Sequence, residues 1–502
     1  MEASPSSTPG LKRSLSVWAA VGLSVALMAP SMAANINPQG SALHAGRAVP
    51  LTFLIAAVGV LLVAYSFVRL CQYFHHAGSV YAFVGATLGP RTGVVAGWGL
   101  LGTYTFYAVV TSAAAGIFGT AFLQEVGIWH NPPTWAPFML LAVALLLALW
   151  LAIMPVRRGG HILLTVEGTT VALILVVTAV VLVRLLAGNA PGGHTFTLSV
   201  FSVAPGTPSN ELFLGVVFGF LSFAGFEAAA TLGEEARRPT RDIPRAILGT
   251  AIFGGLYFVI VTAVEVMGFG AGPAGVKAFT NSQSLLGDLG SSYVGSWVGD
   301  VITLGTAISA FGCCLACVVG AARLVYALSR DTAGPRGLGQ SHSRWGTPVW
   351  ATLAVVVAAG IIVIVETAVA AQANAFNSFL WSGTIGTLIL LVVYVLASVG
   401  CIMLVFVRHK LPVPMWQLIV PVAGLVVLGY TLYRNVWPWP AGSAAWIPLT
   451  SGIWLAVAVI VVIFAAGTAR KLGAALAARE GIKAPGTEEP EPRLAAARDE
   501  SA

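Results

Sequence analysis

Apolar residues occur in long uninterrupted runs along the chain, and charged or turn-forming residues gather in the short segments between these runs. A helix needs about 20 apolar residues to cross the hydrocarbon of a membrane. The pattern therefore predicts an all-α membrane protein with twelve transmembrane helices. The predicted spans are Ser16–Asn37, Pro50–Phe74, Thr92–Leu123, Trp135–Pro155, Ile162–Leu186, Glu211–Gly233, Ile243–Gly270, Ser292–Leu328, Pro348–Ala371, Phe376–Val407, Trp416–Tyr433 and Ile447–Ala466.

The composition agrees with this pattern. Hydrophobic residues make up 57% of the 502 residues and charged residues only 9%, whereas soluble domains carry roughly 25% charged residues. The net charge of +7 does not indicate nucleic-acid binding, because the basic residues lie in short segments between apolar runs. The five cysteines lie in or beside apolar runs and do not suggest a disulfide framework.

The basic residues also predict the orientation in the membrane. Twelve spans place both termini on one side, and with both termini in the cytoplasm 22 of the 26 Lys and Arg residues are cytoplasmic, as the positive-inside rule requires. We expect a multi-pass protein of the bacterial inner (plasma) membrane. Alternatively, the segment from Lys12 to Ala34 is a cleaved signal peptide, but the uncharged stretch between Ser14 and Ala42 is too long for one.

Two of the predicted spans contain residues that interrupt a helix. Pro30 in the first span lacks an N–H, and its ring clashes with the preceding turn. Gly219 and Gly225 weaken the sixth span, where Ser222 also competes for backbone hydrogen bonds. Spans one and six are corresponding members of two five-span halves. Interruptions at such positions indicate an inverted-repeat transporter with its substrate site at the breaks.

An opened helix offers the groups that bind a zwitterion. Free N–H groups at the N-terminus of a half-helix attract a carboxylate, and the opposing carbonyl groups suit an ammonium group. An amino acid matches both features without a buried charged side chain. The candidate substrate-binding residues lie at the two breaks and on the third, eighth and tenth spans: Ala29, Pro30, Ser31, Met32, Tyr104, Tyr107, Phe220, Ser222, Phe223, Ala224, Gly225, Ser309 and Trp381.

Three carboxylates inside predicted spans are candidates for proton coupling, because a charged group at the centre of a membrane costs about 2.5–3.5 kcal/mol on insertion scales. Glu227 is the first choice, since it is next to the break in the sixth span. Glu167 in the fifth span is the second. Glu265 lies toward the outer end of the seventh span, where we favour a structural or vestibule role.

Three spaced groups of residues resemble motifs of the amino acid–polyamine–organocation permeases, and they occur in the family's order over the first ten spans. The groups are Gly78-Ser-Val-Tyr81-Ala-Phe-Val with Leu88-Gly-Pro-Arg91 and Gly97-Trp98; Phe223-Ala-Gly-Phe-Glu227 with Gly233-Glu-Glu-Ala-Arg237-Arg-Pro239 and Asp242-Ile-Pro-Arg-Ala-Ile247; and Arg323-Leu-Val-Tyr326-Ala-Leu-Ser-Arg330-Asp331 with Gly346-Thr-Pro348-Val-Trp350.

The resemblance implies a LeuT-like fold of two inverted five-helix repeats followed by two additional helices. These parts would be residues 14–187, 211–410 and 411–470, between cytoplasmic tails of residues 1–13 and 471–502. The resemblance also implies an amino acid permease that works by proton-coupled symport or exchange.

Two features depart from the family. Many members have a Gly-Ser-Gly-like turn in the first span, whereas this chain reads Ala29-Pro-Ser-Met-Ala33. Glu167 stands where some members carry a coupling lysine, and its opposite charge leaves its role open.

Other functions remain open to different degrees. An amine or polyamine permease, or a transporter-like sensor without flux, fits the same pattern. A membrane enzyme is disfavoured because neither His-Glu-x-x-His nor Gly-x-Ser-x-Gly occurs. We expect no cofactor and no metal, with a small-molecule substrate, protons and membrane lipid as partners. Sodium coupling is less favoured, because cysteines at 313, 314 and 317 replace adjacent hydroxyl groups in the eighth span.

Overall fold

The structure is a computed structural model, and it describes residues 17–74, 80–154, 159–208, 211–232, 236–330, 337–342, 346–370, 374–465, 467 and 470–471. The elements of this part of the chain are helices. The α-helices are α1 (Val17–Met28), α2 (Pro30–Ala45), α3 (Val49–Tyr73), α4 (Val80–Leu88), α5 (Pro90–Glu125), α6 (Ala136–Ile153), α7 (Gly159–Leu186), α8 (Glu211–Phe223), α9 (Pro239–Phe269), α10 (Pro273–Asn281), α11 (Leu285–Tyr293), α12 (Ser296–Arg330), α13 (Val349–Val369), α14 (Ala375–Ile402), α15 (Ile419–Val436) and α16 (Trp446–Phe464).

Eleven helical runs in the described residues are long and apolar enough to cross a membrane. The prediction of an all-α, multi-pass membrane protein is therefore confirmed. The first run, Ala20–Tyr73, has 54 residues and contains both of the first two predicted spans. At 1.5 Å per residue such a run would measure about 80 Å as one straight helix, far more than the hydrocarbon thickness. A 3₁₀ turn at Gly46–Ala48, with a positive φ of 57° at Gly46, separates α2 from α3.

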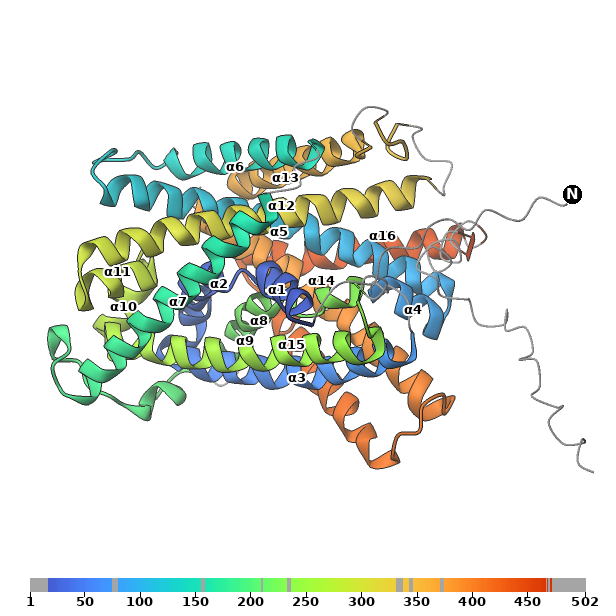
Figure 1. The fold of residues 1–502 in the computed structure, drawn as a ribbon, viewed down its shortest axis with the longest axis horizontal. Helices are drawn as coiled ribbons and strands as arrows, with labels where there is room; N and C mark the ends of the chain where they lie inside the picture. Colours follow the sequence, from blue (N-terminus) through green and yellow to red (C-terminus); the bar gives the residue numbers. More distant parts are fainter. Residues whose placement is uncertain are drawn as a thin grey trace, which may run out of the picture.

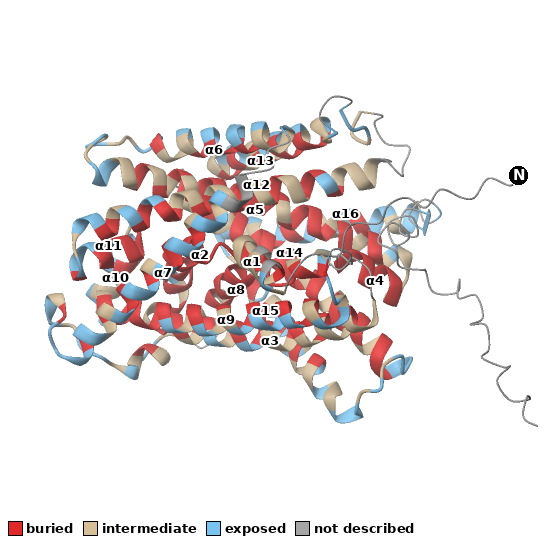
Figure 2. Cartoon of the chain, viewed as in Figure 1, coloured by how far each residue is buried: buried red, intermediate tan, exposed pale blue. Residues whose placement is uncertain are grey.

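The bundle has a buried centre and an apolar surface. In Figure 1, α5, α6, α12 and α13 run alongside one another across the upper part, and α3 and α9 across the lower part. Between these layers lie α1, α2 and α8. Buried residues concentrate in the middle, whereas α6 and α13 show exposed faces (Figure 2). These faces carry large apolar side chains such as Leu146 and Ile364, as expected of a surface that contacts lipid.

Two short helices at one end of the bundle, α10 and α11, form a cover that we call the lid. They lie at the opposite end of the molecule from α4 (Figure 1). Asn35 of α2 donates from Nδ2 to Ser284 Oγ at 3.2 Å and accepts from the Leu286 N–H at 2.8 Å. Gln39 Nε2 donates to the Phe279 carbonyl at 3.1 Å. The lid is thus fastened to α2 at this end of the bundle.

Candidate functional site

The predicted interruption of the first span is present in the structure. Helix α1 ends at Met28, and α2 begins at Pro30. Ala29 between them adopts a left-handed conformation, with φ 44° and ψ 58°. An L-residue with a Cβ pays about 1–2 kcal/mol to adopt this conformation. Because Pro30 has no N–H and fixes its own φ, it suits the first position of a new helix.

Side chains from three other helices bind the backbone groups at this first break. Glu167 Oε1 on α7 accepts from the Ser31 N–H at 2.9 Å. Tyr257 on α9 donates its hydroxyl to the Pro30 carbonyl at 3.3 Å. Cys313 Sγ on α12 lies 3.4 Å from the Leu27 carbonyl and donates to it. The Ser31 N–H and the Pro30 and Leu27 carbonyls at the break therefore have partners within the protein, as the interior of a membrane requires.

The second break follows α8. Helix α8 ends at Phe223, a turn covers residues 224–227, and a 3₁₀ helix, η4, runs from Ala228 to Leu232. Gly225 in the turn has φ 102°, a conformation that favours glycine. Gly219, which the sequence also marked, stays inside α8. A Cβ there would lie 2.6 Å from the Ala56 Cβ, so this glycine allows α8 to approach α3 closely.

Hydrogen bonds join the two broken helices on both sides of the breaks. Asn37 Nδ2 on α2 donates to Ser222 Oγ on α8 at 2.7 Å. On the other side, the Ala229 N–H of η4 donates to Ser24 Oγ of α1 at 3.0 Å. The C-terminal half of the first broken helix, α2, is therefore held to the N-terminal half of the second, α8. The N-terminal half of the first, α1, is held to η4 of the second.

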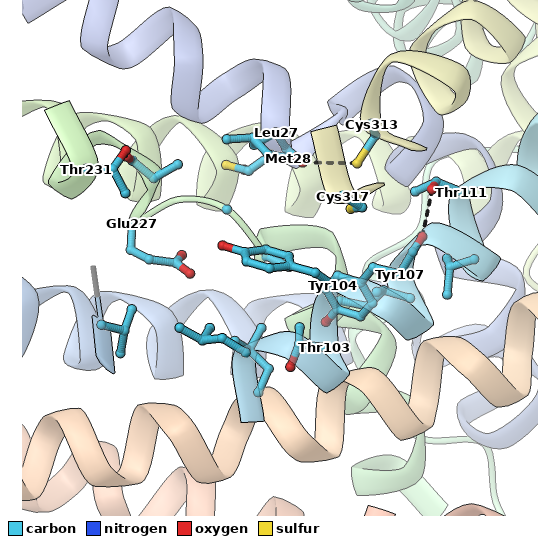
Figure 3. Close-up of a pocket in the computed structure, with 18 of the residues that line it drawn as sticks. Leu27, Met28, Thr103, Tyr104, Tyr107, Thr111, Glu227, Thr231, Cys313 and Cys317 are labelled. Atoms are coloured by element: carbon cyan, nitrogen blue, oxygen red, sulfur yellow. Dashed lines mark hydrogen bonds between the residues drawn. The ribbon is translucent and has the colours of Figure 1, made fainter. Parts of the chain in front are cut away.

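A cavity lies where the two breaks meet (Figure 3). Six of the predicted site residues line it: Met32, Tyr104, Tyr107, Ala224, Gly225 and Glu227. Thr103, Thr231, Cys313 and Cys317 contribute further polar or sulfur atoms. The cavity reaches the exposed Thr231 of η4. Its opening is therefore on the side of α1 and η4, away from the lid.

Glu227 is the acidic group of this cavity. Its carboxylate and the Tyr104 hydroxyl point toward one another in Figure 3. Glu227 Oε2 accepts from the Tyr394 hydroxyl of α14 at 2.9 Å. The Tyr107 hydroxyl lies 3.0 Å from Thr387 Oγ1, also on α14. Among the described residues that line the cavity, none has a cationic side chain. The chemistry offered is one carboxylate, tyrosine rings and hydroxyl groups.

The other residues predicted at the breaks are buried in the packing around the cavity. Ala29, Pro30 and Ser31 form the turn into α2 but are not among the residues that line the cavity. The Phe223 ring packs against Phe258, with centroids 5.3 Å apart. Phe220 packs against Gly59, where a Cβ would meet its ring at 2.7 Å. At the second break, Ala224 and Gly225 therefore line the cavity. Phe220 and Phe223 instead pack against neighbouring helices.

Three predicted residues lie away from the cavity. Ser309 on α12 is buried and does not line the cavity, and its hydroxyl lies beside the Glu167 carboxylate. Trp381 on α14 lines a separate apolar cavity together with Glu366 and Trp446. Glu265 on α9 is fully buried, and neither of its carboxylate oxygens has a partner in the described part of the chain.

Two residues with clear contacts were missed by the sequence analysis. Tyr394 binds the Glu227 carboxylate, but nothing distinguishes it in the sequence from other membrane tyrosines. Glu366 accepts from Ser382 Oγ at 2.7 Å. It lies inside the predicted ninth span, so the criterion that selected the other intramembrane carboxylates also applied to it.

Membrane-length helices in which two interrupted helices meet at a cavity are the architecture of secondary transporters. The comparisons with known proteins identify the family. The model of the amino acid permease family matches residues 38–472, so the chain belongs to this family. The resemblance that the sequence motifs showed is thereby confirmed.

The relatives are permeases and transporters, not enzymes. The low-affinity putrescine importer PlaP of Escherichia coli is 26% identical over 67% of this chain and 72% of its own length. The branched-chain amino acid permease BcaP of Bacillus subtilis is 24% identical over 62% of this chain and 66% of its own length. Human cationic amino acid transporter 4 is 26% identical over 62% of this chain and 48% of its own length.

Proposed function

We propose that this protein is a proton-coupled permease that carries an amino acid or a related amine across the bacterial inner membrane. The meeting of two broken helices at a cavity with a carboxylate, Glu227, carries this proposal. Helix breaks at a cavity are where transporters of this architecture bind their cargo. Relatives named for putrescine and for branched-chain amino acids support both substrate classes.

The proposed membrane layout has twelve spans. The run Ala20–Tyr73 counts as two spans joined by the turn at Gly46–Ala48. The halves are then residues 14–187 and 211–410, followed by two more spans in 411–470. Apart from residue 471, the tails of residues 1–13 and 471–502 lie outside the described residues. With both termini in the cytoplasm, the cavity opens to the cytoplasm and the lid covers the outer side.

Glu227 and Glu167 are the proposed coupling residues. Each carboxylate binds a group from another helix: Glu227 the Tyr394 hydroxyl, and Glu167 the Ser31 N–H at the start of α2. Protonation weakens a carboxylate as an acceptor. A proton on either residue would therefore loosen one half of a broken helix. This is the kind of local change that shifts a transporter between its two open states.

The test is uptake into proteoliposomes of a labelled pool of amino acids and amines, with and without an inward proton gradient. Accumulation of one component only with the gradient supports the proposal and identifies the substrate. Uptake that needs internal substrate, whatever the gradient, indicates exchange instead of symport. Binding without movement of any component contradicts the proposal and indicates a sensor.

A further inference from the structure

At the first break, a carboxylate of the protein occupies the position that the carboxylate of a zwitterionic substrate would take. The N-terminus of a helix carries free N–H groups and a partial positive charge, so it attracts carboxylates. In α2, Pro30 has no N–H, and the Ser31 N–H is bonded to Glu167 Oε1 at 2.9 Å. Glu167 belongs to α7, 136 residues away in the sequence. The fold therefore brings a distant acidic side chain to the N-terminus of α2.

At this break the cavity is lined by Leu27, Met28, Met32 and the Cys313 thiol, whereas Ser31 and Glu167 do not line it. A carboxylate inside the cavity would therefore have neither the Ser31 N–H nor a cationic side chain among the described lining residues. It would also lie in the same cavity as the Glu227 carboxylate. A buried negative charge without a partner, close to a second negative charge, is strongly disfavoured.

The same cavity favours an ammonium group. Glu227 supplies a negative charge, and the rings and hydroxyl groups of Tyr104 and Tyr107 supply cation–π surface and acceptors. At the lid end, a second pocket contains the carboxylates of Glu125 and Asp288 as its charged groups, among the described residues that line it. Clefts with one sign of charge concentrate ligands of the opposite sign. This pocket and the cavity at the breaks therefore both favour cations.

We infer that Glu167 acts as an internal substitute for the substrate carboxylate, so that the cavity selects amines without an α-carboxylate over the corresponding amino acids. This inference rests on the proposed function, since it names the substrate class of the same site. Glu167 is a specificity-determining residue in this view. It acts through the N-terminus of α2 and not by contact with the amine.

The test uses pairs of compounds that differ only by the carboxylate: putrescine and ornithine, cadaverine and lysine, isobutylamine and valine. Valinamide is added because it keeps the size of the carboxylate without its charge. Purified full-length protein is assayed for binding by competition and, in proteoliposomes, for uptake. We expect the amine of at least one pair to be preferred over its amino acid by about 30-fold or more. Valinamide should compete better than valine.

Two variants separate a specificity role from a structural one. In Glu167→Ala the Ser31 N–H loses its partner, and the removed side chain leaves space beside it for a substrate carboxylate, so the preference for the amine should fall to within about 3-fold. Glu167→Gln, which keeps the shape and one acceptor oxygen, serves if the alanine variant does not fold. This variant should also lower the ratio of amine binding to amino acid binding, because the negative charge of Glu167 is gone. The matched control is Glu366→Gln, a buried carboxylate in the separate cavity, which should keep the wild-type ratio.

The outcomes distinguish the two proposals. Equal uptake of both members of every pair, or preference for the amino acids, overturns the inference and leaves the permease intact. An unchanged ratio in a folded Glu167→Ala variant also overturns it. If amines bind selectively but no compound is taken up, the inference about Glu167 stands and the proposed permease function is overturned.

Discussion

The two helix breaks at the centre of this permease use the same device but differ in what they present to the cavity. At the first break, Ala29 turns the chain, and side chains of α7, α9 and α12 occupy the exposed backbone groups. At the second, the turn around Gly225 lines the cavity directly and brings Glu227 into it. The comparison teaches that a broken helix can be enclosed by side chains of other helices or can line a cavity directly. What decides is which groups fill the break.

If the second break is the binding element, loss of its charge should have the largest effect. We expect Glu227→Gln to lower uptake of the transported amine about 100-fold, because a buried charged partner of the ammonium group is lost. Initial rates in proteoliposomes measure the effect. Glu366→Gln is the control and should remain within about 2-fold of wild type. Full gradient-dependent uptake by Glu227→Gln would contradict the assignment.

The turn geometry of the second break should be the next most sensitive feature. Gly225→Ala forces an L-residue to φ 102° and places a Cβ 2.9 Å from the Leu27 Cβ. We expect a loss of about 2 kcal/mol in stability, measured by thermal unfolding in detergent. Gly249→Ala in α9 is the matched control. No atom lies within 4 Å of its new Cβ, and alanine favours a helix by about 0.5–1 kcal/mol. An equal response in both variants would refute the strain argument.

A smaller effect is expected when only the partner of Glu227 is changed. Tyr394→Phe removes one hydroxyl and leaves the ring in place, so uptake at limiting substrate should fall about 10-fold. Tyr293→Phe removes a hydroxyl that donates to the Gly268 carbonyl at 3.0 Å, far from the cavity, and should leave uptake unchanged. If the two variants behave alike, the Tyr394 bond does not support Glu227.

The smallest effect should come from the residue that turns the first break. Ala29→Gly relieves the left-handed strain of about 1–2 kcal/mol but gives the unfolded chain more freedom. The two effects oppose one another, and we expect a gain in stability below about 1 kcal/mol with unchanged uptake. Thermal unfolding again provides the measurement. A loss above 1 kcal/mol would show that the Ala29 methyl group itself holds the break.

The position of a helix break could be predicted from the residues at the break itself. The side chains that contact the break could not, because they belong to distant parts of the chain. Pro30 correctly located the first break, because proline cannot continue a helix. Gly219 and Gly225 looked alike in the sequence, yet one packs against Ala56 inside a helix and the other forms a turn. A glycine permits both roles, and the neighbours that decide between them belong to other helices.

The same limit applies to the candidate site. Tyr104, Tyr107 and Glu227 were named from their types and positions, and the fold brings them to one cavity. Trp381 was also named from its residue type and position, but it lines a different cavity. The bond from the Ser31 N–H to Glu167 joins residues 136 positions apart. No pattern within either span reveals such a pair, since it depends on how α2 and α7 pack.

The Glu167 bond also bears on what the empty carrier can do. A ligand that is part of the chain has a fixed effective concentration, which does not depend on the medium on either side of the membrane. While Glu167 is ionised, the Ser31 N–H therefore keeps its partner after the cargo has left. Return of the unloaded carrier exposes no unpaired Ser31 N–H to the membrane interior. We therefore expect the unloaded carrier to return without a second cargo molecule, which predicts net accumulation and not obligatory exchange.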